Sequence, residues 1–578
     1  MLGVAGAASQ NHNLGKLLSF FGISWRTIAS EELFDLDHEG DEDLSKPRVF
    51  CSADAFLRVL QELERTSIAS TAWEKSVHSV FVYAGDNADS LQRLVRLLVQ
   101  DEGIVLQKTN GSAVDFVLSD RWDHFCGVMS GIRATVSAQD VSFIPCMSKG
   151  DVFDIFSSDF GSAFLKINYQ GLDVFLSISK EIIDINANLT SRCFDVREHF
   201  LSAVPIVLYI KWAFARTCWQ PLEVNACLVI DDPVLKPKYG CIDFEKFLGL
   251  MVQHNFSTSI AFIPWNWQRS QPAVAGLFRK NPDRYSLSIH GCDHTAAEFG
   301  DRDRNRIACK ASLAVERMRR HESKTGLGHD RVMVFPQGVF SAAAMTALKH
   351  AGFVAAVNTE MISVDRDASI KISDAWDVAV TGYAGFPLFT RRYPSQGIEN
   401  FAFDILLGKP CIAVIHHDYC RDRYAHVLKF VEQLNRLKCR LSWRSLGEIV
   451  KHSYRQRELS PGVIEIEMYA SEILIRNDSD RVKRFSIRRR ETDSSSIDRI
   501  RDESGSIPWN VFDGHISVEL ELRPGQRKTI SLAFRQFSEN GRFHWNIPYR
   551  FKTMIRRYAS EARDNYVTPA RFRFSRSR

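Results

Sequence analysis

The chain has 578 residues, too many for one hydrophobic core, and predicts several domains of about 100–200 residues each. Hydrophobic residues make up 45% and charged residues 25%, as in ordinary globular proteins. The net charge of +5, from 74 Lys and Arg against 69 Asp and Glu, is too small to indicate a nucleic-acid-binding protein. The 12 cysteines form no CxxC pair, so we expect reduced thiols, no zinc–cysteine site and a cytoplasmic location.

Two segments bear on targeting. The first fifteen residues contain no basic stretch that leads into a long apolar run, so we predict no signal peptide. The apolar run at residues 200–210 is followed closely by Lys211 and Arg216. Because about 20 apolar residues are needed to cross a bilayer, we predict a buried helix there.

Residues 1–200 are predicted to form an N-terminal α/β domain. Strands alternate with amphipathic helices, which is typical of a Rossmann-like or flavodoxin-like sheet. No GxGxxG or P-loop pattern follows Gly85, so we expect scaffolding or partner binding rather than nucleotide binding. The strands are expected at residues 48–51, 79–85, 162–168 and 173–177, and the helices at 14–22, 52–65 and 89–100.

Residues 201–458 predict an α/β barrel of the incomplete TIM type, with about seven or eight strands alternating with helices. After the run that ends at Asp231, strands are expected at residues 257–264, 285–290, 331–336, 353–358, 382–390 and 411–417. The apolar period then changes to two, and Asn477-Asp478-Ser479 and Arg523-Pro524-Gly525 are turn patterns. Residues 459–540 therefore predict a β-sandwich.

Residues 541–578 form a basic tail with interleaved aromatic residues, such as Arg556-Arg557-Tyr558 and Arg571-Phe572-Arg573-Phe574. Two interpretations stay open. The tail wraps on the body of the protein, or it contacts an anionic membrane surface or an anionic polymer.

Two motifs carry the chemistry. Cys227-Leu228-Val229-Ile230 is an apolar run that stops at Asp231 and Asp232, and a second apolar run ends in His290 and His294. Polar residues at the carboxyl ends of buried strands build the sites of α/β proteins, and Asp and His hold divalent metals. Taken singly, an Asp-Asp pair is often a turn or cap and an HxxxH is often one helix face. Together and in this order they predict a metal-assisted hydrolase.

With His417 after a third strand, this order of motifs resembles the polysaccharide deacetylases of the NodB-homology type over residues 222–450. The resemblance implies that Asp231 is the general base and that Asp232, His290 and His294 bind a divalent metal, zinc above all. It implies that His417 is the general acid. His416 is the weaker choice for the acid, since neighbouring strand residues point to opposite faces.

The sequence departs from that family's pattern. Its Arg-x-Pro-Tyr motif is matched only by Val334-Phe335-Pro336-Gln337-Gly338, which lacks the arginine that orients the base. Arg391 and Arg392 are candidates to replace it if the fold brings them in. Trp265 and Trp267 are candidates to stack on a sugar ring, with buried packing as the alternative. Pro336, Arg391, Arg392 and the two tryptophans are thus the expected substrate-binding residues.

The predicted function is removal of an acyl group, N-acetyl first, from a polysaccharide or oligosaccharide, with an acylated glycan as partner and no nucleic acid. Two alternatives stay open. A glycoside hydrolase on a similar barrel requires a carboxylate pair, for which Asp231 and Asp377 are available. A catalytically silent carbohydrate-binding or assembly module in polysaccharide biosynthesis is favoured by the missing motif arginine.

Overall fold

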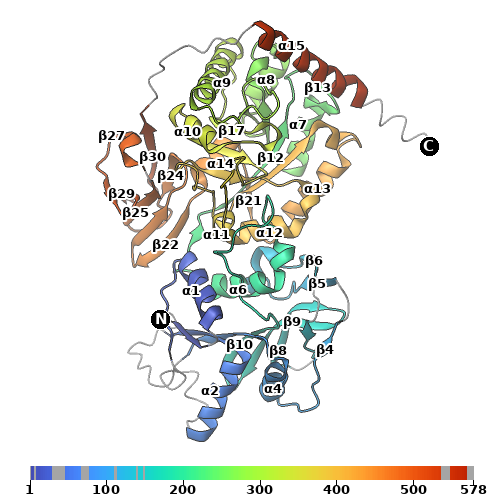
Figure 1. Ribbon diagram of the computed structural model, residues 1–578, viewed down its shortest axis with the longest axis vertical. Coiled ribbons are helices and arrows are strands. Elements are labelled where there is room, and N and C mark those ends of the chain that lie inside the picture. Colours follow the sequence, from blue (N-terminus) through green and yellow to red (C-terminus); the bar gives the residue numbers. More distant parts are fainter. Residues whose placement is uncertain are drawn as a thin grey trace, which may run out of the picture. The chain divides into compact units, whose positions relative to one another are not determined.

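The computed structural model describes residues 2–5, 8–28, 46–66, 77–109, 113–137, 141–147, 150–491, 493–535 and 547–568 (Figure 1). The chain divides into two compact units. The first contains residues 1–187, 194–219 and 398–406, and the second contains residues 188–193, 220–397 and 407–578. The first unit thus takes helix α6 (Phe200–Ala213) and most of α12 (Ile398–Leu407), both from the range expected for the barrel. The predicted domain boundaries stay predictions.

The first unit is built on one eight-stranded sheet in the order β1-β2-β3-β10-β9-β8-β5-β6. Its core is aromatic: Phe50, Phe81 and Phe175 pack around Tyr209 of α6, whose hydroxyl lies 2.8 Å from Ser79 Oγ. The run at residues 200–210 is therefore a buried helix, as predicted. The strands of this sheet are β1 (Leu2–Ala5), β2 (Arg48–Ser52), β3 (Ser79–Tyr83), β5 (Val114–Leu118), β6 (Arg133–Val136), β8 (Val152–Ser158), β9 (Gly161–Tyr169) and β10 (Leu172–Ser177).

The expectation of a Rossmann-like or flavodoxin-like sheet fits only half of this unit. Strands β1, β2, β3 and β10 are parallel, and helices α1 (Ala8–Phe20), α2 (Ala53–Thr66) and α4 (Ala88–Val99) follow the first three. From β10 onward the pairs are antiparallel, through β9, β8, β5 and β6. The physical reason is the short connections: Gln170 and Gly171, both at positive φ, turn β9 directly into β10, and no crossover helix fits there.

The second unit contains the predicted barrel. Seven strands pair in parallel in the order β19-β18-β17-β16-β15-β12-β20. A bridge between Arg392, just after β19, and Ala413 of β20 joins the two ends of the sheet, with Arg392 N donating to Ile412 O at 2.9 Å. The strands are β12 (Val224–Asp231), β15 (Thr258–Phe262), β16 (Tyr285–His290), β17 (Val332–Val334), β18 (Ala355–Asn358), β19 (Leu388–Thr390) and β20 (Cys411–His416).

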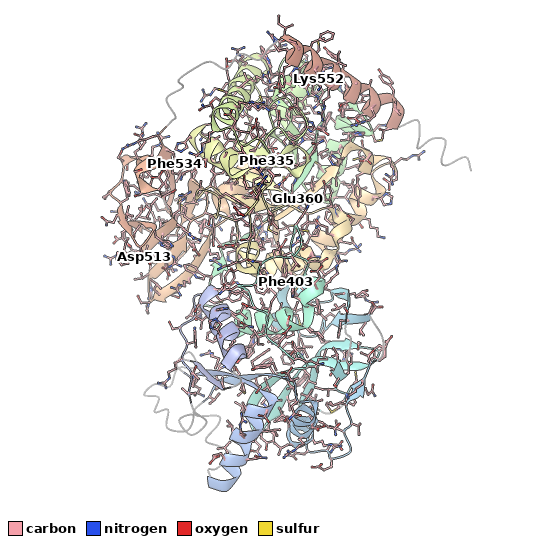
Figure 2. All side chains as sticks on the ribbon, viewed as in Figure 1. Phe335, Glu360, Phe403, Asp513, Phe534 and Lys552 are labelled. Carbon is pink, nitrogen blue, oxygen red and sulfur yellow. The ribbon has the colours of Figure 1, made fainter. Side chains whose placement is uncertain are left out.

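Helices alternate with the strands and surround the barrel (Figure 1). Asp243 caps the start of α7 (Phe244–His254) and accepts from Lys246 N, and Asp303 caps the start of α9 (Arg304–Thr325) and accepts from two amides. Phe335, labelled in Figure 2, is buried directly after β17 and stacks on Phe340. The helices are α7 (Phe244–His254), α8 (Pro272–Lys280), α9 (Arg304–Thr325), α10 (Ala342–His350), α11 (Ile372–Trp376) and α13 (Ala425–Asn435).

After α14 (Leu446–His452), two further sheets enclose one apolar core that includes Ile466, Phe485, Ile475 and Ile530. The larger sheet contains β11 (Gln220–Pro221), β22 (Arg455–Ser460), β23 (Val463–Glu467), β25 (Lys483–Arg490), β29 (His515–Leu522) and β28 (Asn510–Phe512). The smaller contains β24 (Glu472–Arg476), β30 (Arg527–Phe534), β26 (Ile497–Asp502) and β27 (Gly505–Ser506).

None of the twelve cysteines, all of which lie in the described ranges, is assigned to a disulfide. Across the described ranges, no helix has the length and apolar character that a bilayer crossing requires.

Candidate metal centre

Three predicted ligands meet at the carboxyl ends of β12 and β16. His290 Nε2 lies 3.5 Å and His294 Nε2 3.1 Å from Asp232 Oδ1. One ligand atom from each of these residues lies within 4.8 Å of the other two. The strands explain the meeting, because β12, β15 and β16 are parallel neighbours and their ends share one edge of the barrel. The Asp232 side chain is 20% exposed and that of His294 is 14% exposed, so part of the cluster reaches the surface, whereas Asp232 Oδ1 is buried.

The donor set fits a divalent metal. His290 Nδ1 lies 2.9 Å from the carbonyl oxygen of Val334, which can only accept, so Nδ1 carries the proton. In neutral His290, Nε2 therefore has a free lone pair, and that lone pair faces a carboxylate oxygen. Two lone pairs that face each other repel unless a proton or a metal cation lies between them. A histidine held by a backbone carbonyl in this way is typical of metal ligands.

The loop from His290 to His294 is held by one carboxylate. Glu298, which is buried, accepts from the amides of Cys292 (2.8 Å), Asp293 (3.1 Å) and His294 (2.9 Å). Gly291 has φ +62°, and a Cβ there would lie 2.2 Å from Glu298 Oε1 and 2.5 Å from Pro336 Cγ. Only glycine fits at that position. The backbone of the metal loop is therefore fixed before any metal binds.

Asp231 is held apart from the cluster by an arginine. Arg391, at the end of β19, donates to both carboxylate oxygens, at 2.7 and 2.8 Å. Both residues are buried. Burial would raise the pKa of Asp231, but the positive charge of Arg391 and its two hydrogen bonds outweigh burial and hold the pKa below its usual value. Asp231 is therefore ionised at neutral pH.

His417 is buried at the start of the turn after β20, whereas His416 is exposed. The Nε2 atom of His417 lies 3.5 Å from Asp564 Oδ1, and Tyr239 donates to the other Asp564 oxygen at 2.9 Å. Burial lowers the pKa of His417, but hydrogen bonds to Asp564 and Cys241 have the larger, opposite effect and raise the pKa to about 9. His417 is thus protonated at neutral pH.

Asp564 belongs to a C-terminal segment that sequence reasoning did not connect with the site. Helix α15 (Ile547–Ala562) and the π-turn after it (Arg563–Val567) lie against the barrel, beside α8 and the hairpin β13–β14 (Lys238–Tyr239, Ile242–Asp243) in Figure 1. Glu561 pairs with Lys236 and Arg269, Asn565 accepts from Gly240 N, and Tyr549 donates to Asp293.

The inner side of this segment is polar, and its outer side carries both apolar and basic residues. Thr553, Arg557, Glu561 and Asp564 are buried, at helical spacing, and this stripe is the sequence pattern that could have located the contact. Phe551, Tyr566 and Lys552, the last labelled in Figure 2, are exposed. Residues 547–568 therefore wrap on the body, while residues 541–546 and 569–578 of the predicted tail lie outside the described ranges. Contact with a membrane or anionic polymer stays a prediction.

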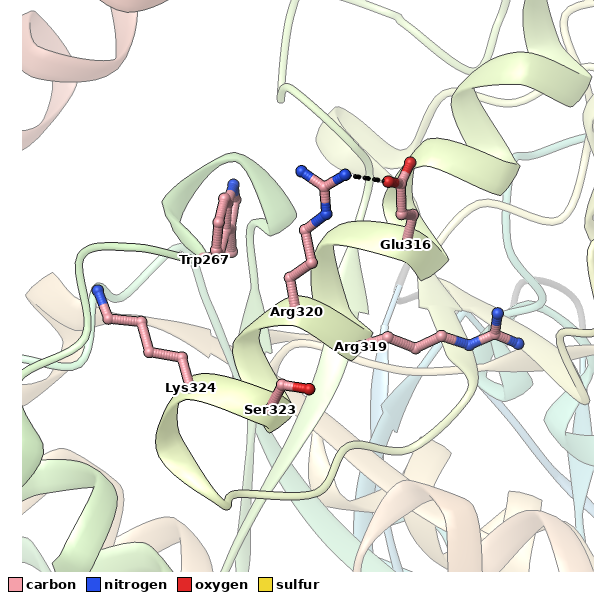
Figure 3. A pocket seen from close by; sticks show the side chains of 6 residues that line it. All are labelled: Trp267, Glu316, Arg319, Arg320, Ser323 and Lys324. Carbon is pink, nitrogen blue, oxygen red and sulfur yellow. Dashed lines mark hydrogen bonds and ion pairs between the residues drawn. The ribbon is translucent and has the colours of Figure 1, made fainter.

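The other expected substrate-binding residues lie at different places. Trp265 N donates to Cys292 O, so this tryptophan lies at the metal loop, with its ring edge-on to Tyr558. Trp267 instead faces a groove of about 480 Å³ along α9, lined also by Glu316, Arg319, Arg320, Ser323 and Lys324 (Figure 3). Pro336 contacts Gly291. Arg392 is buried, and its backbone joins β19 to β20.

Asp377 does not form a carboxylate pair with Asp231. Tyr469 donates to Asp377, and Arg455 lies 3.3 Å from it. In the sheet, Arg455 of β22 lies opposite Pro221 of β11, which precedes β12, whereas Asp231 ends β12. Asp377 thus lies near the start of this barrel strand and Asp231 at its end, which does not favour a glycoside hydrolase pair; that alternative stays a prediction.

No family model and no curated protein matches the chain. Among solved structures, a carbohydrate deacetylase described as novel is similar over 92% of this chain and 98% of its own, with 11% identity and a TM-score of 0.45. A family 4 carbohydrate esterase from Streptomyces lividans, in complex with acetate, is similar over 39% of this chain and 92% of its own, with 11% identity and a TM-score of 0.25. A family 4 pseudoenzyme from Bacillus anthracis is similar over 39% and 68%, with 13% identity and a TM-score of 0.23. Identities and TM-scores this low do not identify the substrate or the acting residues.

Proposed function

We propose that the protein is a metal-dependent hydrolase that removes an acyl group, N-acetyl first, from an amino-sugar polymer or oligosaccharide. The supporting observation is that the two neighbouring aspartates have different partners. Asp232 faces two histidines, whereas both oxygens of Asp231 are held by Arg391. One carboxylate is thus available to a metal and the other to a proton.

A divalent ion on Asp232, His290 and His294, with zinc as the first choice, would lower the pKa of a bound water and polarise the acyl oxygen. Asp231 takes a proton from the attacking water as the new C–O bond forms. His417 gives its proton to the amine nitrogen as the C–N bond breaks. Acetate and a free amine leave. Arg391 orients the base, which is the task of the arginine missing from the family motif.

The direct test is acetate release from N-acetylated oligosaccharides by protein loaded with zinc or cobalt. We expect release from loaded protein, loss after dialysis against a chelator, and recovery on reloading. Loaded protein that retains its metal and releases no acetate from any acetylated glycan would favour the catalytically silent module.

The pH dependence of that activity tests the role of Asp564. The groups that face His417 are Asp564, Cys241 and Tyr239, and the charge of Asp564 stabilises the protonated imidazole. Since the acid must be protonated, activity should fall as pH rises through about 9 in the wild type. Asp564→Asn removes that charge, so the alkaline limb should move down by roughly 1–3 pH units.

A full pH–rate profile of both proteins measures this shift. Asp498→Asn, the same chemical change at a side chain that is 53% exposed in β26, serves as the control. An alkaline limb that stays at the same pH in Asp564→Asn would exclude this role for Asp564.

A further inference from the structure

The inner side of α15 carries a buried arginine without a partner. Arg557 is 6% exposed, and its Nη1 has no hydrogen-bond partner among the residues that the structure describes. No ion pair of its guanidinium is found there either. An arginine stays charged in proteins. A buried charge without a partner is costly, so a site of this kind calls for an anion or another acceptor.

The carboxylates near Arg557 are already engaged. The charges that act on it most strongly include Asp232 and Asp564, with Tyr239 beside them. Asp232 faces the two histidines of the metal cluster. Asp564 is shared by Tyr239, His417 and Arg563, and Glu561, one turn away on α15, pairs with Lys236 and Arg269. The fork of N–H groups on Arg557 is therefore left for a ligand.

The charges at this end of the barrel also favour an anionic ligand. The carboxylates of Asp231, Asp232, Glu561 and Asp564 face more cations than they can neutralise, and a bound divalent ion adds to the excess. The cations are Lys236, Arg269, Arg391, Arg557, Arg563 and protonated His417. A site with an excess of one charge attracts and holds ligands of the opposite charge.

We propose that Arg557 binds an anionic group of the substrate, so that the site takes an acylated glycan that carries carboxylates rather than a neutral one. A planar guanidinium matches a carboxylate through two parallel hydrogen bonds. This inference rests on the proposed function, because it places the anion on the sugar whose acyl group lies at the metal cluster. Arg557 acts here as a specificity residue and takes no part in the proton transfers.

Binding, measured by calorimetry, tests the inference without turnover. The protein is metal-loaded Asp231→Asn, and the probes are a tetrasaccharide of alternating glucuronic acid and N-acetylglucosamine and the neutral N-acetylglucosamine tetramer. A hydrogen bond to a charged group is worth about 1.5–3 kcal/mol, so the acidic probe should bind about 10–100-fold more tightly. Adding Arg557→Gln should abolish that preference and leave neutral binding unchanged.

Three controls make the result specific. Arg550→Gln removes the same charge from an exposed position of α15 and should retain the preference. Arg557→Lys keeps the charge without the fork and should retain part of it. Thermal melts show that each variant is folded. Equal binding of both probes by the parent protein, or equal weakening of both by Arg557→Gln, would overturn the proposal. Because binding is read without chemistry, failure of the hydrolase proposal would appear separately, as absent acetate release.

Discussion

Asp231→Asn should reduce acetate release by about 10²–10⁴-fold and leave the metal in place, because loss of a general base typically costs that much. The asparagine has the same shape but cannot accept the proton of the attacking water. Metal should stay bound because both oxygens of Asp231 are directed at Arg391 and not at the histidines. The measurement is acetate release with metal content determined on the same samples.

The control for this experiment is Asp418→Asn, the same chemical change one residue after His417, where the side chain is 43% exposed. It should retain activity. Asp231→Asn also leaves the buried Arg391 without its counter-charge, so some loss of stability is expected and thermal melts must accompany the rates. Wild-type release by folded Asp231→Asn would show that Asp231 is not the base.

The barrel could be predicted from sequence because each buried strand leaves a local pattern: an apolar run followed by polar residues. Parallel strands then bring those polar residues to one edge, which is why Asp232, His290 and His294 meet. Arg391 could be suggested but not placed, because its contact with Asp231 joins residues 160 positions apart. Its position depends on how β19 closes the barrel.

Other features could not be derived from local patterns. The contact between Tyr239 and Asp564 spans 325 positions and depends on where α15 lies after the β-sheets. The role of Glu298 could not be predicted, because a carboxylate that accepts from three loop amides leaves no recognisable sequence motif. The antiparallel half of the first unit differs from the prediction. Strands alternate with helices only in the first hundred residues, and the turn at Gly171 instead joins two antiparallel strands.

Asp232, His290 and His294 are proposed to hold a divalent metal, so removal of either histidine should abolish metal binding. Each ligand supplies one donor atom, and three donors are the usual minimum for a catalytic zinc site. With one histidine removed, the two donors left should not retain the ion through purification. His426→Ala removes an exposed histidine outside the cluster and is the matched control.

Elemental analysis of carefully purified protein tests this claim most directly. Wild type, Asp231→Asn and His426→Ala should contain near-stoichiometric zinc or a similar ion, whereas His290→Ala and His294→Ala should contain almost none. Thermal melts would show that the two cluster variants are folded, so that metal loss is not a result of unfolding. Equal metal content in all five proteins would contradict the metal site.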